Sequence, residues 1–217
     1  MKISILCSSR SHPAYPWLEK WCNSRQQHDD IELVETSAAL KGGDLLFLVS
    51  CNEMIPRLLR QRYRATLVLH ASDLPKGRGW SPHIWQILDG KRRILVTLLE
   101  AGDQVDSGDI WAQEWMEFEG HELYEEINAK LFATELRLME RAVEQFETIR
   151  PQPQGSGPAT YYRKRTPADS QLDPEKSLAE QFDLLRVSDP QRYPAYFDYR
   201  GHRYVLHIEK AMGDSNG

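Results

Sequence analysis

Residues 44–70 read "DLLFLVSCNEMIPRLLRQRYRATLVLH", and this stretch decides the fold. Its two ends, 44–50 and 65–70, are aliphatic runs that are too short for helices and rich in Leu and Val, which predicts strands. Residues 55–61, between them, favour a helix. A strand, a helix and a second strand in this order predict two parallel strands, because a parallel crossover needs a connection long enough to hold a helix.

The same alternation continues on both sides of this stretch. Further strands are predicted at 3–6, 31–35, 93–100 and 109–118, and further helices at 14–26, 81–88 and 122–149. In the last helix the apolar residues recur at helical spacing and form one stripe: Leu123, Ile127, Leu131, Met139, Val143 and Phe146. We therefore expect an α/β fold, with a Rossmann-like, mostly parallel sheet, helices on both faces and a site at the carboxyl ends of the strands.

A stretch without regular structure separates this region from the C-terminal part. Residues 151–158 read "PQPQGSGP", which supports neither a helix nor a central strand, because Pro lacks a donor and Gly is costly to order. We predict a main domain at 1–150, a linker at 151–160 and a small α+β subdomain at 161–217. The subdomain should hold a short helix from about Asp173-Pro174 and a β-hairpin that turns at Arg200-Gly201.

The composition of the chain disfavours nucleic acids and membranes as partners. The chain has 217 residues, of which 41% are hydrophobic and 27% charged, and a net charge of -5; a nucleic-acid surface usually carries a strong positive excess, so a polynucleotide partner is disfavoured. No stretch approaches the roughly 20 apolar residues of a membrane span, and the N-terminus turns polar too early for a signal peptide. We therefore expect a cytoplasmic protein without a membrane partner. Cys7, Cys22 and Cys51 lack any CxxC spacing, which indicates buried free thiols and no zinc site.

His70 stands at the carboxyl end of a predicted strand, where an α/β sheet exposes its site. Asp106 follows 36 positions later, in an acidic, glycine-bearing loop between the strands 93–100 and 109–118. If the two loops are neighbours, the carboxylate can accept a hydrogen bond from the imidazole and fix the tautomer of a proton-shuttling ring. The alternative is a strand-end His that is satisfied by a backbone carbonyl.

The segments around these two residues resemble those of a known family. Residues 70–88, "HASDLPKGRGWSPHIWQIL", are similar to the 10-formyltetrahydrofolate-dependent formyltransferases, in which His–x–Ser is followed by Leu-Pro, a basic turn with Gly and a Pro that opens the next helix. Residues 105–113, "VDSGDIWAQ", resemble the Asp–x–Gly segment of the family. Residues 163–173 and 193–210 resemble the region after the catalytic domain in methionyl-tRNA and sugar formyltransferases. The resemblance covers about 44–210, and ordered motifs are more specific together than any one alone.

The resemblance implies that residues 1–150 form the catalytic domain, with His70 and Asp106 as its catalytic residues. An uncharged amine would attack the formyl carbon of 10-formyltetrahydrofolate through a tetrahedral intermediate, with His70 in proton transfer or oxyanion stabilisation and Asp106 orienting the ring and helping to remove the proton. The Asn that the family places two positions before the His is Val68 here, which cannot donate a hydrogen bond. Either Asn52 supplies the missing amide or a protonated His70 makes the main oxyanion contact; a cap or turn role is the structural alternative for Asn52.

The resemblance also implies a folate slot between two strand-end loops, and no metal. Edge hydrogen bonds from the main chain suit a flat pterin. The cofactor-binding residues expected on this basis are Cys51, Asn52, Glu53, Met54 and Ile55 in the first loop, and Glu100, Ala101, Gly102 and Asp103 in the second.

Two polar loops are candidates for binding the acceptor. They are the basic turn Lys76, Arg78 and Gly79, and the loop Ser8, Ser9 and Arg10 after the first strand. Each is either a solvated loop or a contact for an anion, such as a phosphate of the acceptor or, for the basic turn, the glutamate tail of the folate.

The resemblance favours a small acceptor. A methionyl-tRNA formyltransferase would need a larger, positive C-terminal domain, so we expect a nucleotide-linked amino sugar, as in enzymes of bacterial surface glycan or flagellin-sugar biosynthesis, including the pseudaminic-acid type. The alternatives are a peptidyl, carrier-bound or aminoacyl amine, and an inactive folate- or nucleotide-binding module in which Val68 marks lost activity. The hairpin aromatics Tyr196, Tyr199 and Tyr204 could pack on the core, form a homodimer interface or border the acceptor.

Overall fold

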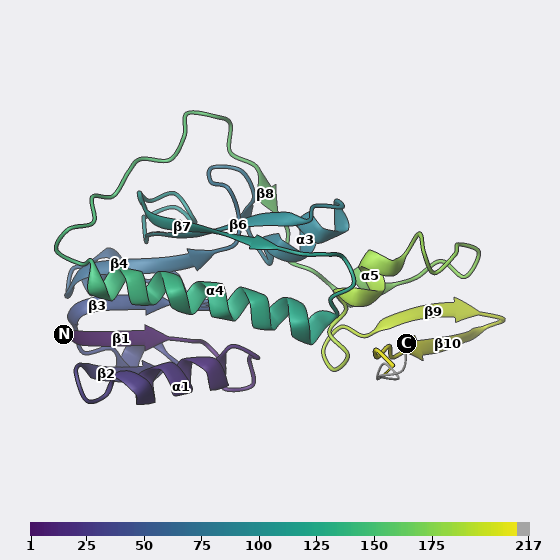
Figure 1. Cartoon of the computed structure of the whole chain (residues 1–217), viewed down its shortest axis with the longest axis horizontal. Helices are drawn as coiled ribbons and strands as arrows, with labels where there is room; N and C mark the ends of the chain where they lie inside the picture. The colour runs from purple at the N-terminus through teal and green to yellow at the C-terminus, as the bar shows by residue number, and fades with distance from the viewer. Residues whose placement is uncertain (212–217) are drawn as a thin grey trace, which may run out of the picture.

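The computed structural model describes residues 1–211, and its centre is a six-stranded sheet in the order β2-β1-β3-β4-β6-β7 (Figure 1). The strands are β1 (Lys2–Leu6), β2 (Asp30–Val34), β3 (Gly43–Leu48), β4 (Tyr63–His70), β6 (Arg93–Glu100) and β7 (Ile110–Glu117). The helices around the sheet are α1 (Tyr15–Arg25), α2 (Arg57–Arg60), α3 (Pro82–Leu88) and α4 (Tyr124–Glu144), with a short 3-10 helix at Ser37–Ala39. The predicted α/β class with a mostly parallel, Rossmann-like sheet is confirmed.

The first four strands pair in parallel, whereas β6 and β7 are antiparallel to their neighbours. The reason is the connection from β4 to β6. His70 pairs with Thr97, so β6 begins beyond the carboxyl end of β4. The intervening α3 has 7 residues and spans only about 10 Å, so it does not run back along the eight-residue β4, which is about 26 Å long. The chain therefore re-enters the sheet in the opposite direction.

Both faces of the sheet are covered, as expected. Along β3, Leu45 and Phe47 belong to one apolar cluster, while Leu46 and Leu48 belong to another on the opposite face, because side chains alternate along a strand. The first cluster includes buried residues of α1, α3 and α4, and α4 runs along the sheet in Figure 1. The second is closed by Ile55 and by Leu59 of α2.

Two helices are shorter than predicted. The helix expected at 55–61 is reduced to α2, because Pro56 precedes it and the Arg60 side chain turns back to the Ile55 carbonyl (3.1 Å). The long amphipathic helix begins at Tyr124, where the Glu126 carboxylate accepts the Leu123 N–H (2.8 Å), and it ends at Glu144.

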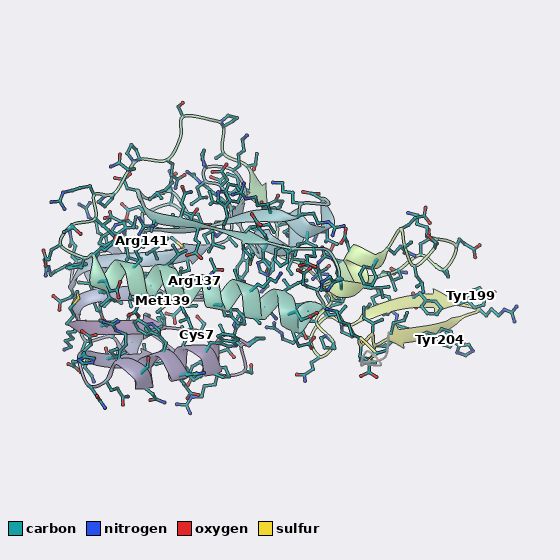
Figure 2. All side chains as sticks on the ribbon, in the orientation of Figure 1. Cys7, Arg137, Met139, Arg141, Tyr199 and Tyr204 are labelled. Carbon is teal, nitrogen blue, oxygen red and sulfur yellow. The ribbon has the colours of Figure 1, made fainter. Side chains whose placement is uncertain are left out.

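The strands of the C-terminal part form two small sheets, one of them with a strand of the main domain. β8 (Tyr161–Tyr162) pairs in parallel with β5 (Arg78–Gly79), and β9 (Ala195–Tyr199) pairs with β10 (His202–Leu206) as a hairpin. The turn predicted at Arg200-Gly201 is confirmed; both residues have positive φ (49° and 81°), as a type I′ turn requires. Tyr196 is buried, whereas Tyr199 and Tyr204 are exposed on the hairpin (Figure 2).

The helix predicted from Asp173-Pro174 is wrong. Residues 173–181 form turns, in which the Gln181 amide accepts the Asp173 N–H (2.6 Å) and donates to the Asp173 carbonyl (3.0 Å). These side-chain bonds satisfy the backbone without a helix, and α5 (Phe182–Arg186) begins only after them, following a 3-10 helix at Pro167–Ser170. Leu172, Leu185 and Ala195 form a small apolar cluster of their own. The division at 151–160 remains a prediction.

Two general properties complete the description. Cys7 and Cys22 are buried, Cys51 is half-buried, and all three thiols are free. Within residues 1–211, no helix has the length and the apolar character needed to cross a membrane.

A buried charge cluster fastens α5 to the start of α4. The Glu122 side chain is 3% exposed, and its carboxylate accepts the N–H groups of Glu119 (2.9 Å) and Gly120 (2.8 Å) and the Lys130 ammonium (2.6 Å). Arg186, which is 1% exposed, brings its guanidinium to 3.9 Å from the same carboxylate. Burial alone would raise the pKa of Glu122, but Lys130 and the two N–H groups outweigh it and lower the pKa to about 2.

Glu122→Gln should destabilise the protein in a pH-dependent way. The folded pKa of about 2 lies below the ordinary value of 4.5, so the carboxylate stabilises the fold above that value, and this contribution fades as the pH falls toward 2. We expect the free energy of unfolding at pH 7 to drop by roughly 2–3 kcal/mol, measured by urea denaturation.

The matched control is Glu125→Gln, three residues away and exposed, which should change the unfolding free energy by less than about 0.5 kcal/mol. A difference between wild type and Glu122→Gln that is as large at pH 3 as at pH 7 would contradict the assignment.

Candidate active site

His70 is the last residue of β4, and its side chain is 6% exposed. Its Nε2 donates to the carbonyl oxygen of Gly77 at 2.8 Å. Its Nδ1 faces the Asp106 carboxylate, 3.5 Å from Oδ2, at the outer limit of hydrogen-bond distance. The structure thus gives His70 both of the partners that the sequence left open, a backbone carbonyl and a carboxylate.

The loop that carries Asp106 reaches His70 by folding back along the sheet. Because β6 runs antiparallel to β4, Glu100 pairs with Leu67, and the loop that follows β6 begins three residues short of His70. Residues 101–109 return toward His70 instead, with Asp106 in the left-handed region (φ 51°). The Gly79 N–H donates to Asp106 Oδ2 at 2.9 Å, so the carboxylate is fixed from the loop that follows His70.

Two glycines allow the backbone of each loop to pass close to another part of the chain. A Cβ on Gly79 (φ 97°) would lie 2.4 Å from the Tyr162 carbonyl oxygen, and one on Gly108 would lie 2.0 Å from the Glu100 carbonyl oxygen. Real Cβ atoms do not approach backbone oxygens to such distances. Gly108 is the glycine of the Asp–x–Gly segment, so that motif has a steric reason here.

The segment 152–162, which we call the strap, lies across both loops. In Figure 1 the chain leaves α4, passes beside β7 and reaches β8. Gln152 exchanges two backbone hydrogen bonds with Ile110 (2.7 and 2.9 Å), and Thr160 accepts the Gly77 N–H on its hydroxyl (2.8 Å) and the Arg78 N–H on its carbonyl (2.9 Å). Sequence reasoning missed these contacts, because a Pro- and Gly-rich stretch carries no periodic signal.

The two loops expected to form the folate slot are joined by Arg60. Its guanidinium donates to the carbonyls of Ile55 (3.1 Å) and Ala101 and to the Asp103 carboxylate. Cys51 and Ala101 also pack with Val68 against the second apolar cluster, which contains Ile55. The structure therefore brings residues 51–55 and 100–103 together, and Arg60 is a residue that the sequence analysis did not single out.

Several residues of these two loops form hydrogen bonds to other parts of the chain or are exposed to solvent. Glu53 accepts hydrogen bonds from Ser37, and Glu100 accepts the Trp111 indole N–H at 2.9 Å. Met54 is 60% exposed. Asn52 is exposed as well; its backbone N–H donates to the Ser8 hydroxyl (2.9 Å). Leu48 pairs with Val68, so Asn52 follows β3 at the edge of the sheet where β4 ends with His70.

The loop after β1 is tied partly to this edge and partly away from it. Ser8 contacts Asn52, as above, whereas Ser9 pairs with Ser11 through their hydroxyls at 2.8 Å. The Arg10 guanidinium donates to Glu35 (2.8 Å) and lies over the Tyr15 ring. Of the three predicted acceptor residues in this loop, the structure connects only Ser8 to the other predicted residues.

A surface of cations stacked on aromatic rings borders the site, and we call it the cation–aromatic surface. The pairs are Arg78 on Tyr161, Arg163 on Trp85 and Lys164 on Trp80. Lys76 is exposed beside it. Within residues 1–211, neither Lys76 nor Lys164 forms an ion pair with a carboxylate, so both charges are available to an anion. Of the residues in this region, only Lys76, Arg78 and Gly79 were predicted from the sequence to bind the acceptor. Tyr161 belongs to β8, which lies at the end of the strap.

His83 lies near His70, and His12 lies near His83. Burial lowers the pKa of His83 to about 3, helped by the nearby His70 and His12, and burial also lowers the pKa of His12 to about 4, helped by Arg192. Both rings are therefore neutral at pH 7. No group of three His, Cys, Asp or Glu side chains within residues 1–211 is arranged to hold a metal ion.

The chain belongs to the formyl transferase family, whose sequence model matches residues 6–143. It is 29% identical over 159 residues to the methionyl-tRNA formyltransferase of Lachnospira eligens, covering 72% of this chain and 50% of that protein. It is 31% identical over 159 residues to the enzyme of the same name from Protochlamydia amoebophila, covering 72% and 49%. The chain thus spans about half the length of these curated relatives, and the family expected from the sequence motifs is confirmed.

Solved structures share the fold. A methionyl-tRNA formyltransferase from Clostridium thermocellum superposes with a TM-score of 0.82 at 19% identity, over 100% of this chain and 95% of the other. A sugar N-formyltransferase from Shewanella sp. gives 0.73 at 15%, over 99% of both chains. HypX from Aquifex aeolicus in complex with tetrahydrofolic acid gives 0.75 at 23%, over 96% of this chain and 37% of that one.

Gly108→Ala should displace the Asp106 loop, because the new methyl group would collide with the Glu100 carbonyl. We expect an unfolding free energy lower by about 1–3 kcal/mol, measured by chemical denaturation. Gly157→Ala is the control, since no atom of residues 1–211 lies within 4 Å of the place that its new methyl group would take. Equal effects of the two substitutions would show that the close approach of Gly108 does not matter.

Proposed function

We propose that this formyltransferase moves the formyl group of 10-formyltetrahydrofolate to an amine, with His70 and Asp106 as its catalytic residues. The observation that carries the proposal is the 3.5 Å approach of His70 Nδ1 to Asp106 Oδ2. Both side chains are more than nine-tenths buried, and each is fixed by a backbone group of the Gly77–Gly79 turn. A buried imidazole beside a fixed carboxylate is suited to proton transfer.

The reaction requires the movement of one proton. The amine nitrogen gains the formyl carbon and loses a proton, while N10 of the folate loses that carbon and gains a proton. His70 donates from Nε2 to Gly77, so Nδ1, which faces Asp106, is the ring nitrogen that can gain a proton; once protonated, it donates to the Asp106 carboxylate. The pair can take the proton from the amine and return it to the leaving nitrogen, and the positive ring can stabilise a developing oxyanion.

The residues around the two joined loops fit the folate that the family implies. Val68, Cys51 and Ala101 offer a partly buried apolar lining, and the loop backbones between Cys51 and Ile55 offer edge hydrogen bonds for a flat heterocycle. The donor supplies the activated one-carbon group; the chain orients it and handles the proton. Arg60 keeps the two loops at a fixed separation.

A small, phosphate-bearing amine is the acceptor that we propose, of the nucleotide-linked amino sugar class. The cation–aromatic surface supports it, because Lys76 and Lys164 can meet phosphates and the rings can stack on a base. The net charge of -5 argues against a long polyanion. The likeness in fold to the sugar N-formyltransferase from Shewanella supports the same class.

A second acceptor is favoured by the curated relatives, which are methionyl-tRNA formyltransferases. An assay that offers 10-formyltetrahydrofolate with nucleotide amino sugars in one arm and methionyl-tRNA in the other separates the two. Tetrahydrofolate release with sugars alone supports the first proposal, and release with methionyl-tRNA alone replaces it by the second. Release in neither arm leaves no support for a catalytic role and favours a binding module.

His70→Gln and Asp106→Asn should each lower kcat by roughly 10²- to 10⁴-fold, because each removes a member of the proton-transfer pair. Tetrahydrofolate release with the active acceptor measures the effect. His202→Gln is the control, since His202 is an exposed residue of the hairpin. Turnover by either site variant within a few-fold of this control would refute the assignment.

Asn52→Ala tests whether this residue replaces the amide that Val68 lacks. If Asn52 donates to the oxyanion, kcat should fall by about 100- to 1000-fold, and adding Val68→Asn should restore part of the loss. Asn23→Ala, an exposed change on α1, should have no effect. Unchanged turnover of Asn52→Ala would assign the oxyanion contact to His70 instead.

A further inference from the structure

The Gln154 side chain joins the two loops that hold the His70–Asp106 pair. Its Nε2 donates to the carbonyl oxygens of Asp106 (2.8 Å) and Gly108 (2.9 Å). Its Oε1 accepts from the Arg78 guanidinium at 2.7 Å. One amide therefore contacts the turn that carries the carboxylate and the turn that follows the histidine.

The chemistry of these partners requires an amide. Two carbonyl oxygens need two N–H donors and a guanidinium needs an acceptor, and the Gln side chain offers both at one end. A carboxylate at this place would set oxygen against two carbonyl oxygens, and an aliphatic side chain would leave all three partners unsatisfied. Within residues 1–211, Arg78 has no alternative acceptor of equal quality: its Nη1 lies 3.3 Å from the Tyr161 hydroxyl, and its buried Nε has no partner.

The backbone that Gln154 contacts is the backbone that aims the carboxylate. Asp106 has a positive φ (51°), a conformation that costs a non-glycine residue about 1 kcal/mol or more unless its surroundings hold it. Gln154 binds the carbonyl of this same residue, and Gly79, next to Arg78, donates to the carboxylate. Gln154 thus binds the main chain of Asp106, and Gly79 binds its side chain.

We propose that Gln154 is a positioning residue for the formyl transfer: it sets the Asp106 carboxylate against His70 without touching either substrate. The catalytic consequence of this inference rests on the proposed function. The hydrogen bonds by which Gln154 joins the two loops, which we call the clamp, rest on the geometry alone. The strap is then more than a connection to the C-terminal part; it is a component of the site supplied from 48 residues beyond Asp106.

The test uses the full chain with Gln154→Ala and the isosteric Gln154→Glu. We expect kcat with the acceptor that the wild type uses to fall by roughly 10- to 100-fold in both, with little change in the KM for 10-formyltetrahydrofolate, because Gln154 forms hydrogen bonds to neither of the two proposed folate loops. Hydrogen exchange measured by mass spectrometry should be faster in the peptides that contain Gly79 and residues 104–109, and unchanged in α1.

Gln152→Ala is the matched control. It lies two residues away in the strap, and its exposed amide donates only to the Arg150 carbonyl within residues 1–211; its bridge to Ile110 uses the backbone and survives the substitution. The inference would be overturned if the Gln154 variants kept the wild-type kcat and the wild-type hydrogen exchange, as Gln152→Ala should. A uniform rise in exchange with unchanged kcat would also overturn it, as a merely structural role. If the wild type releases no tetrahydrofolate, the proposed function fails, and the local exchange result alone decides whether the clamp exists.

Discussion

The hydrogen bond from the Gly79 N–H to Asp106 Oδ2 is the contact on which the site depends. The same short turn supplies the Gly77 carbonyl to His70 Nε2, so two backbone groups two residues apart fix the ring and the carboxylate together. A bond to a charged oxygen contributes about 1.5–3 kcal/mol, which holds the carboxylate in one position. The Gln154 amide joins the two loops that hold this pair, the strap binds the Gly77–Gly79 turn, and Gly79 and Gly108 leave room for the backbone of Tyr162 and of Glu100.

The sheet was predictable to the extent that its signal is local. Aliphatic runs between polar turns located all six strands, and the periodic stripe located α4. The direction of β6 was not predictable in this way, because the hydrophobic pattern of a buried strand is the same for either direction. The pairing of His70 with Thr97 and of Leu67 with Glu100 gives the direction, and such pairs between distant segments leave no local pattern in the sequence.

The site was predictable in part for a related reason. His70 and Asp106 were found from their places at loop positions and from the motifs around them, and the structure brings them to 3.5 Å. Arg60, Thr160 and Gln154 were missed. Each acts by hydrogen bonding to backbone atoms of a distant segment, and such contacts leave no spacing or composition in the sequence to recognise. Their discovery required the fold.

The family of the chain and the acceptor proposed for it rest on different observations. Membership of the formyl transferase family rests on the match over residues 6–143, whereas the choice of acceptor rests on the chain's own surface. Cations gather beside the site in a protein whose net charge is -5, which suits a compact anion more than an extended one. The half-length overlap with the curated relatives leaves the acceptor to be decided by chemistry at this site.

The most direct measurement follows the carbon atom itself. The protein is mixed with 10-formyltetrahydrofolate carrying ¹³C in the formyl group, together with a nucleotide-linked amino sugar, and the label is observed by NMR. We predict that the ¹³C signal moves to a formamide carbon bonded to the acceptor nitrogen. A label that stays on the folate or appears as free formate, with the acceptor unchanged, would contradict it.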